Sequence, residues 1–164
     1  MPHAICSILL KGGFDQHLAQ EYDLLGIPLG FELTLFPIDV FFTTYWQHKL
    51  NCLGTLETNC PQISWYPNEM VIYELMKRIT NRDLIQYGII LTDYFGGKGS
   101  QYANAFQNEK NLDTKLDTIS KVLRQLGVQK GGFFDEFDAV GLGELRSNPD
   151  YLEKYRDLCE DLGL

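Results

Sequence analysis

The chain has 164 residues, of which 45% are hydrophobic and 22% charged, and this is the composition of an ordinary globular domain. It contains no run of roughly 18 apolar residues, which a membrane span needs, and its N-terminus lacks the charged region of a signal peptide. Its formal net charge of −8 disfavours a nucleic-acid partner, because a negative field repels phosphates. We therefore expect one α+β domain over residues 1–164, cytoplasmic, with no membrane or nucleic-acid partner.

The first fifty residues alternate apolar segments with amphipathic ones. An apolar run predicts a strand over 4–10, and apolar–polar alternation predicts a half-buried strand over 31–36. Asp15 is placed to cap a helix that reaches residue 25, and Asp39 to cap a second helix over 40–50.

The middle of the chain predicts two short strands, over 53–57 and 62–66, around a turn at Asn59, Cys60 and Pro61. Asn68 is placed to cap the clearest helix, over 69–79. Its apolar positions form one stripe: Val71, Ile72, Leu75, Met76 and Ile79.

The second half predicts a hairpin, in which a strong strand over 87–95 pairs with a strand over 101–106 across a five-residue loop with a bulge. Asp113 is placed to cap a helix that ends at Gly127, residues 131–143 look irregular or strand-like, and Asn148-Pro149 opens a final helix. Hairpins mixed with helices favour an α+β fold, with a mainly antiparallel or mixed sheet of about five to six strands and about four to five helices.

The four cysteines are Cys6, Cys52, Cys60 and Cys159. Cys6 lies in an apolar run and Cys159 on the apolar face of a predicted helix, so both are expected to be buried free thiols. Cys52 and Cys60 flank a turn, where a disulfide is the alternative to free thiols. Free thiols agree with a reducing compartment.

The glycine-rich segment Gly96, Gly97, Lys98, Gly99 and Ser100 is a weak candidate for a ligand or anion site, because successive backbone amides can cradle an anion. A phosphate-binding loop requires the lysine after the last glycine and a helix directly after the loop. Here the lysine precedes the last glycine and a strand follows. The segment therefore favours a hairpin turn.

Asp93 interrupts an apolar strand just before this segment and is the one candidate catalytic residue. A turn residue that bonds a neighbouring amide is the alternative interpretation. No nucleophile motif accompanies it, and the carboxylates of residues 135–138 do not fit the spacing of an EF-hand. We expect no metal site and no cofactor.

The C-terminal residues 133–164 hold nine acidic against three basic residues and so carry most of the net charge. A negative surface attracts basic proteins and speeds their association. The candidate partner-binding residues are Asp135, Glu136, Asp138, Glu153, Asp157 and Glu160. Together they are expected to form one acidic surface.

These observations favour a non-enzymatic acidic binding protein, of the immunity, inhibitor or regulatory type, that engages a basic protein through its C-terminal region. One alternative is a small metal- or phosphate-dependent enzyme with a site around Asp93, the 96–100 segment and the 135–138 acids. The other alternative is a small-molecule sensor that uses the aromatic residues of the second helix, namely Phe41, Phe42, Tyr45 and Trp46.

Overall fold

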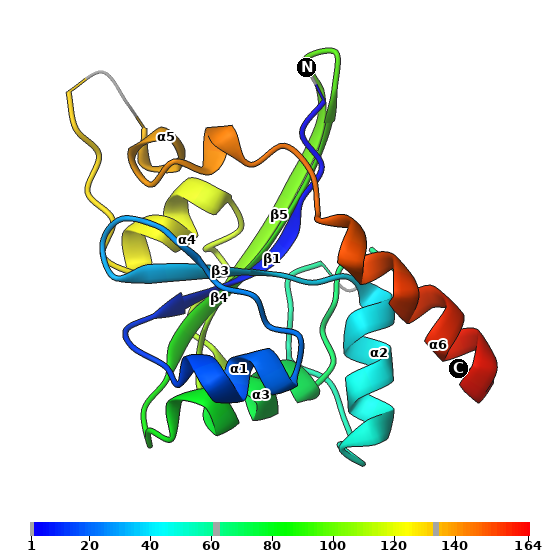
Figure 1. The fold of residues 1–164 in the computed structure, drawn as a ribbon. Coiled ribbons are helices and arrows are strands. Elements are labelled where there is room, and N and C mark those ends of the chain that lie inside the picture. The colour runs from blue at the N-terminus through cyan, green and yellow to red at the C-terminus, as the bar shows by residue number, and fades with distance from the viewer. Residues whose placement is uncertain (1, 61–62, 133–134) are drawn as a thin grey trace.

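The computed structural model describes residues 2–60, 63–132 and 135–164, and it shows one antiparallel sheet with helices on both faces (Figure 1). The strands are β1 (Cys6–Lys11), β2 (Ile27–Pro28), β3 (Leu33–Pro37), β4 (Gln86–Phe95), β5 (Lys98–Gln107) and β6 (Lys110–Asn111). The helices are α1 (Gln16–Glu21), α2 (Val40–Lys49), α3 (Val71–Thr80), α4 (Ile119–Gln125), α5 (Glu136–Ala139) and α6 (Lys154–Leu162), with 3-10 turns at Leu142–Glu144 and Asp150–Glu153. The expected α+β class is confirmed.

The strand order is β2-β3-β1-β4-β5-β6, so β1 lies inside the sheet. Ile8 of β1 pairs with Phe36 of β3 on one side and with Ile89 of β4 on the other. Ile8, Leu9 and Leu10 are all buried, although successive side chains point to opposite faces of a strand. The unbroken apolar run of β1 is thus explained by helices that cover both faces.

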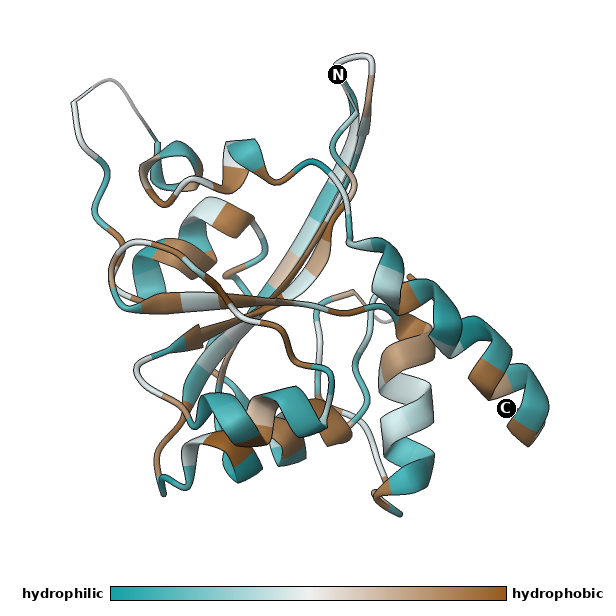
Figure 2. Ribbon diagram, viewed as in Figure 1, coloured by the Kyte–Doolittle hydropathy of each residue, from teal (hydrophilic) through white to brown (hydrophobic). Residues whose placement is uncertain are grey.

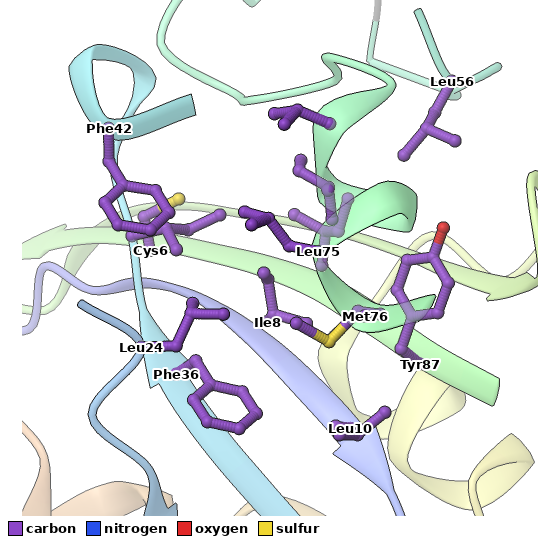
Figure 3. Close-up of a cluster of buried hydrophobic side chains, with 14 of the residues drawn as sticks. Cys6, Ile8, Leu10, Leu24, Phe36, Phe42, Leu56, Leu75, Met76 and Tyr87 are labelled. Atoms are coloured by element: carbon purple, nitrogen blue, oxygen red, sulfur yellow. The ribbon is translucent and has the colours of Figure 1, made fainter. Parts of the chain in front are cut away.

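One face of the sheet carries α1, α2, α3 and α6, and the other carries α4 and α5. Figure 3 shows the core of the first face, where Ile8 and Phe36 of the sheet lie beside Leu75 and Met76 of α3. The apolar residues gather on the strands and the inner helix faces, whereas α6 is mostly hydrophilic (Figure 2). Among the described residues no helix is long and apolar enough to cross a membrane.

Local capping signals succeed at two of the five predicted helices and fail at the other three, the last of which, at Asn148, is described with the cleft below. Asp15 and Asp39 cap α1 and α2 as expected, although α1 ends at Glu21, well before residue 25. Asn68 does not cap α3, which begins at Val71. Asp113 accepts from the backbone N of Lys115 in a turn, and Thr118 caps α4 instead. The apolar stripe predicted for α3 is fully buried.

The strands predicted over 53–57 and 62–66 are wrong for the residues described, while Pro61 and Gln62 lie outside them. Thr55 forms only an isolated bridge with Glu69. The segment is held by side chains instead, because the buried Tyr66 hydroxyl donates to the Ile89 carbonyl and accepts from Asn104. The irregular stretch predicted over 131–143, of which 133–134 lie outside the description, contains α5 and the 3-10 turn Leu142–Glu144.

The β4–β5 hairpin is tighter than predicted. Phe95 pairs directly with Lys98, so the connection has two residues, Gly96 and Gly97, both with positive φ. Such a turn matches the twist of the two strands and requires residues that tolerate positive φ, which these glycines do. β5 therefore begins at Lys98 and pairs with β4 in an unbroken register, without the expected bulge.

Candidate partner-binding cleft

An open cleft of about 830 Å³ lies beside the first two residues of α2 and the start of α6, on the face of the sheet that these helices cover. Its apolar lining includes Cys6 of β1 and Leu91 of β4, both buried. Phe41 of α2 also lines the cleft, as does Trp65 of the loop before α3, which is 50% exposed. The cleft thus combines apolar lining with an accessible aromatic side chain.

Asn148 fixes the segment that leads into α6 against the sheet beside this cleft. Its Nδ2 donates to the Ile38 carbonyl at 2.9 Å, and its Oδ1 accepts from the Cys6 amide at 3.0 Å. The side-chain amide of Asn148 therefore hydrogen-bonds one main-chain group just after β3 and one at the start of β1. It was predicted to cap the last helix, but the structure gives it this bridging role, and the 3-10 turn before α6 starts without a side-chain cap.

The first turn of α6 is also anchored to the turn after α1. The buried Tyr155 donates its hydroxyl to the Asp23 carboxylate, and the Lys154 ammonium lies 2.7 Å from the same carboxylate. Burial opposes the ionisation of Asp23, but the hydrogen bonds from Lys154 and Tyr155 outweigh it and lower the pKa of Asp23. The position of α6 therefore rests on a charged contact on one side and on Asn148 on the other.

The cleft carries a negative charge. Its described lining includes four carboxylates and one cation: Asp39, Asp93, Glu153, Asp157 and Arg156. Asp39 is held by the Phe42 amide at 2.8 Å, yet burial outweighs that bond and raises its pKa. Glu153, at the end of the 3-10 turn before α6, and Asp157 of α6 are both exposed. An anionic ligand would meet an unfavourable field here, whereas a cationic one would be attracted.

Asp93 lies on β4 opposite Ser100 and lines this cleft together with Glu153 and Asp157. Its carboxylate makes no hydrogen bond to another described residue, so the turn bond of the alternative interpretation is not seen. The described residues contain no group of three or more His, Cys, Asp or Glu that could hold a metal ion. Asp93, Glu153 and Asp157 thus line the same cleft.

The five residues of the glycine-rich segment do not form an open loop. Gly96 and Gly97 make the hairpin turn, while Lys98, Gly99 and Ser100 are paired with β4. At Gly99 the chain approaches β4 so closely that a Cβ would lie 1.9 Å from the Asp93 carbonyl oxygen. The segment is therefore a tight hairpin end, which leaves little support for a phosphate-binding loop.

The acids of α5 lie apart from those of α6, so the single acidic surface expected from the sequence is not formed. α5 packs on α4 and α6 packs on α2, on opposite faces of the sheet (Figure 1). The Asp135 side chain caps α5, and Asp138 is exposed.

Glu136 differs from the other predicted partner-binding residues because it is only 4% exposed. Its carboxylate accepts from Arg124 Nε at 2.9 Å. Its own backbone amide and the Arg124 guanidinium lower its pKa. Glu136 therefore joins α5 to α4, and its carboxylate is not free to meet a partner.

Sequence reasoning missed three contributors to the cleft: Trp65, Arg156 and Asn148. Trp65 falls within the strand predicted over 62–66, with no sequence signal that marks it as exposed. The exposure of Trp65 depends on the irregular path of the loop before α3. Asp39 was recognised only as a helix cap. The local signals that pointed to this site were Asp93, which interrupts an apolar strand, and the acidic residues Glu153 and Asp157 near the C-terminus.

Comparison of the chain with protein-family models, with curated proteins and with solved structures finds no match.

Proposed function

We propose that this protein is a non-enzymatic binding protein of the immunity, inhibitor or regulatory type, and that the cleft engages a basic protein partner. The observation that carries the proposal is the cleft itself, whose lining combines Asp93 of the sheet, Glu153 and Asp157 at the start of the C-terminal helical segment, and the exposed Trp65. Tryptophan and other large aromatic residues are over-represented among the residues that dominate protein–protein binding energies. The surrounding carboxylates supply attraction to a basic surface.

A second exposed aromatic side chain lies on the same strand as Asp93. Phe95, at the end of β4, is 76% exposed. Because side chains alternate along a strand, Phe95 points to the same face as Asp93 and Leu91, both of which line the cleft. An exposed aromatic side chain two residues from Asp93 would extend the apolar area that a partner could cover.

An acid–base enzyme is the alternative, and one observation favours it. Asp39 has a raised pKa in the same cleft as Asp93, and perturbed carboxylates in a cleft are typical of active sites. However, Asp39 already has a structural role, since its Oδ1 caps α2 through the Phe42 amide. The binding function explains the exposed aromatics as well as the charge, and we prefer it for that reason.

The test uses a photo-crosslinking phenylalanine derivative in place of Trp65 to capture the partner in an extract of the source cell. We expect a basic protein to be captured and the triple variant Glu153→Lys, Asp157→Lys, Glu160→Lys to lose it. The matched control, Asp138→Lys with Glu144→Lys, changes exposed acids on the other face and is expected to capture normally.

With the captured protein purified, its association with the parent protein should slow as salt rises from about 0.05 to 0.3 M, because screening weakens electrostatic steering. Exposed charges contribute little to folding, so both variants should unfold at the parent temperature within a few degrees. Normal capture by the α6 variant, or a salt-independent association rate, would count against the proposal.

A further inference from the structure

The cleft already binds one guanidinium, which belongs to its own chain. The Cζ of Arg156 lies 5.4 Å from the centroid of the Phe41 ring, within the range of a cation–π contact. Arg156 also acts on the Asp39 carboxyl, where its positive charge opposes the rise in pKa that burial causes. The Phe41 ring and the Asp39 carboxylate, both at the start of α2, thus accommodate a guanidinium on this side of the cleft.

The rest of the cleft offers the same two chemical groups without a cation. Trp65 provides an aromatic surface, and Asp93 provides a carboxylate that makes no hydrogen bond with the other described residues. Of the described residues that line the cleft, Arg156 is the sole lysine or arginine. The cleft has a volume of about 830 Å³, which leaves room for further side chains. Cys6 and Leu91 offer apolar contacts to the methylene stem of a long side chain.

We infer that the cleft is selective for arginine side chains in its partner, and that Arg156 competes with them from within the chain. The inference rests on the proposed function and deepens it. Arginine fits better than lysine because its planar guanidinium stacks on aromatic rings and forms forked bonds to carboxylates, and because it is less strongly hydrated. A lysine ammonium would gain the charge attraction but little of the stacking on Trp65.

Three peptides test the inference: acetyl-Ala-Arg-Ala-Arg-Ala-amide and its matched forms with lysine or with citrulline, the neutral analogue of arginine. The chain has two tryptophans, so Trp46→Phe leaves Trp65 as the sole tryptophan reporter in the cleft. Titrations in this background, followed by Trp65 fluorescence and by calorimetry at about 0.05 M salt, give the three dissociation constants. Circular dichroism checks that the background variant is folded.

The arginine peptide should bind about two- to fivefold more tightly than the lysine peptide, which is the effect of a cation–π contact at a partly exposed site. It should bind at least tenfold more tightly than the citrulline peptide, because the charge attraction is lost. Asp93→Asn should weaken it several-fold. Arg156→Gln should tighten binding of the arginine peptide several-fold, because the competing cation is gone. Lys110→Gln removes an exposed cation on β6 and serves as the matched control.

Equal binding of the arginine and lysine peptides, both sensitive to salt, would overturn the arginine inference and leave the proposed acidic binding function standing. Absence of binding by all three peptides, in fluorescence and in calorimetry, would also overturn it. The proposed function is judged separately, by the loss or survival of whole-partner capture in the α6 charge reversal. Weaker binding by Arg156→Gln would show that Arg156 assists the peptide and would overturn the competing role assigned to it.

Discussion

Gly99 occupies a position in β5 that only glycine fits. Its φ is +157°, and a Cβ there would lie 1.9 Å from the Asp93 carbonyl oxygen and 2.6 Å from the Tyr94 Cα. Both obstructing atoms belong to the backbone, so no side-chain movement relieves the clash. Glycine at this position therefore lets the β5 backbone approach Asp93 and Tyr94 of β4 closely.

We predict that Gly99→Ala destabilises the protein by about 1–3 kcal/mol, the usual cost of a backbone conformation that a side chain does not tolerate. The control is Gly13→Ala, since a Cβ at Gly13 would meet no atom within 4 Å. The φ of Gly13 also lies outside the positive range that residues with a side chain rarely adopt. The control should change the unfolding free energy by less than about 0.5 kcal/mol. Urea unfolding measures both, and equal stabilities would show that the hairpin adapts without cost.

Asp23 makes stability depend on pH. Its pKa in the folded protein is lowered, with burial opposed by the stronger effects of Lys154 and Tyr155. Ionised Asp23 therefore stabilises the fold above its unfolded pKa of about 3.9, and this contribution is lost as pH falls through the lower folded value.

We predict that Asp23→Asn reduces the loss of stability between about pH 5 and pH 3, measured as the midpoint of urea unfolding. Asparagine suits the left-handed backbone of residue 23, whose φ is +54°, so the variant isolates the charge. Asp161→Asn, an exposed acid on α6, is the control and should retain the parent profile. A parental acid profile in Asp23→Asn would contradict the assignment.

At the scale of elements, local patterns predicted those that a few neighbouring residues define. The stripe of α3, the cap of α2 and the apolar runs of β1 and β4 depend on spacing within one segment, and each was recognised. Residues 53–66 were mispredicted because their partners are distant. Tyr66 bonds β4 and β5, and no local periodicity records such contacts.

We predict that Asn148→Ala destabilises the protein by about 2–3 kcal/mol, because the Cys6 amide and the Ile38 carbonyl each lose a hydrogen bond in a partly buried place. The neighbouring Ser147→Ala is the control, since Ser147 is exposed. Hydrogen exchange should show faster exchange at the Cys6 amide and in the first turn of α6. If Asn148→Ala kept the parent exchange rates, α6 would be positioned by its packing and its contacts with Asp23, without Asn148.

At the scale of the whole molecule, the cleft is built from five stretches of chain that are far apart in sequence. They are residues 4–6, 39–41, 65, 91–93 and 148–157. The sequence identified Asp93, Glu153 and Asp157 individually, yet it assigned the first to catalysis and grouped the others with acids that the fold places on the opposite face of the sheet. Which charges share a surface is decided by the packing of α5 and α6, and this packing depends on tertiary contacts.

The four cysteines report on the integrity of the whole fold. All four are free thiols, and Cys6, Cys60 and Cys159 are buried while Cys52 is half-buried. Burial raises the pKa of every one of them, with Glu74 adding to the effect at Cys52 and Asp39 to that at Cys6. Because the thiolate is the reactive form, alkylation of the native protein should be slow at neutral pH.

We predict that iodoacetamide modifies Cys52 first in the native protein and that Cys6, Cys60 and Cys159 react only as fast as the fold opens. Mass spectrometry after alkylation in denaturant, without reductant, should show four modified thiols, and Cys52→Ser should remove the fast native phase. The slow phase should accelerate in Asn148→Ala, because the substitution releases the chain beside Cys6. Two modified thiols in denaturant would indicate a disulfide. A rapid reaction of Cys6 in the native protein would show that the cleft opens more deeply than its buried floor indicates.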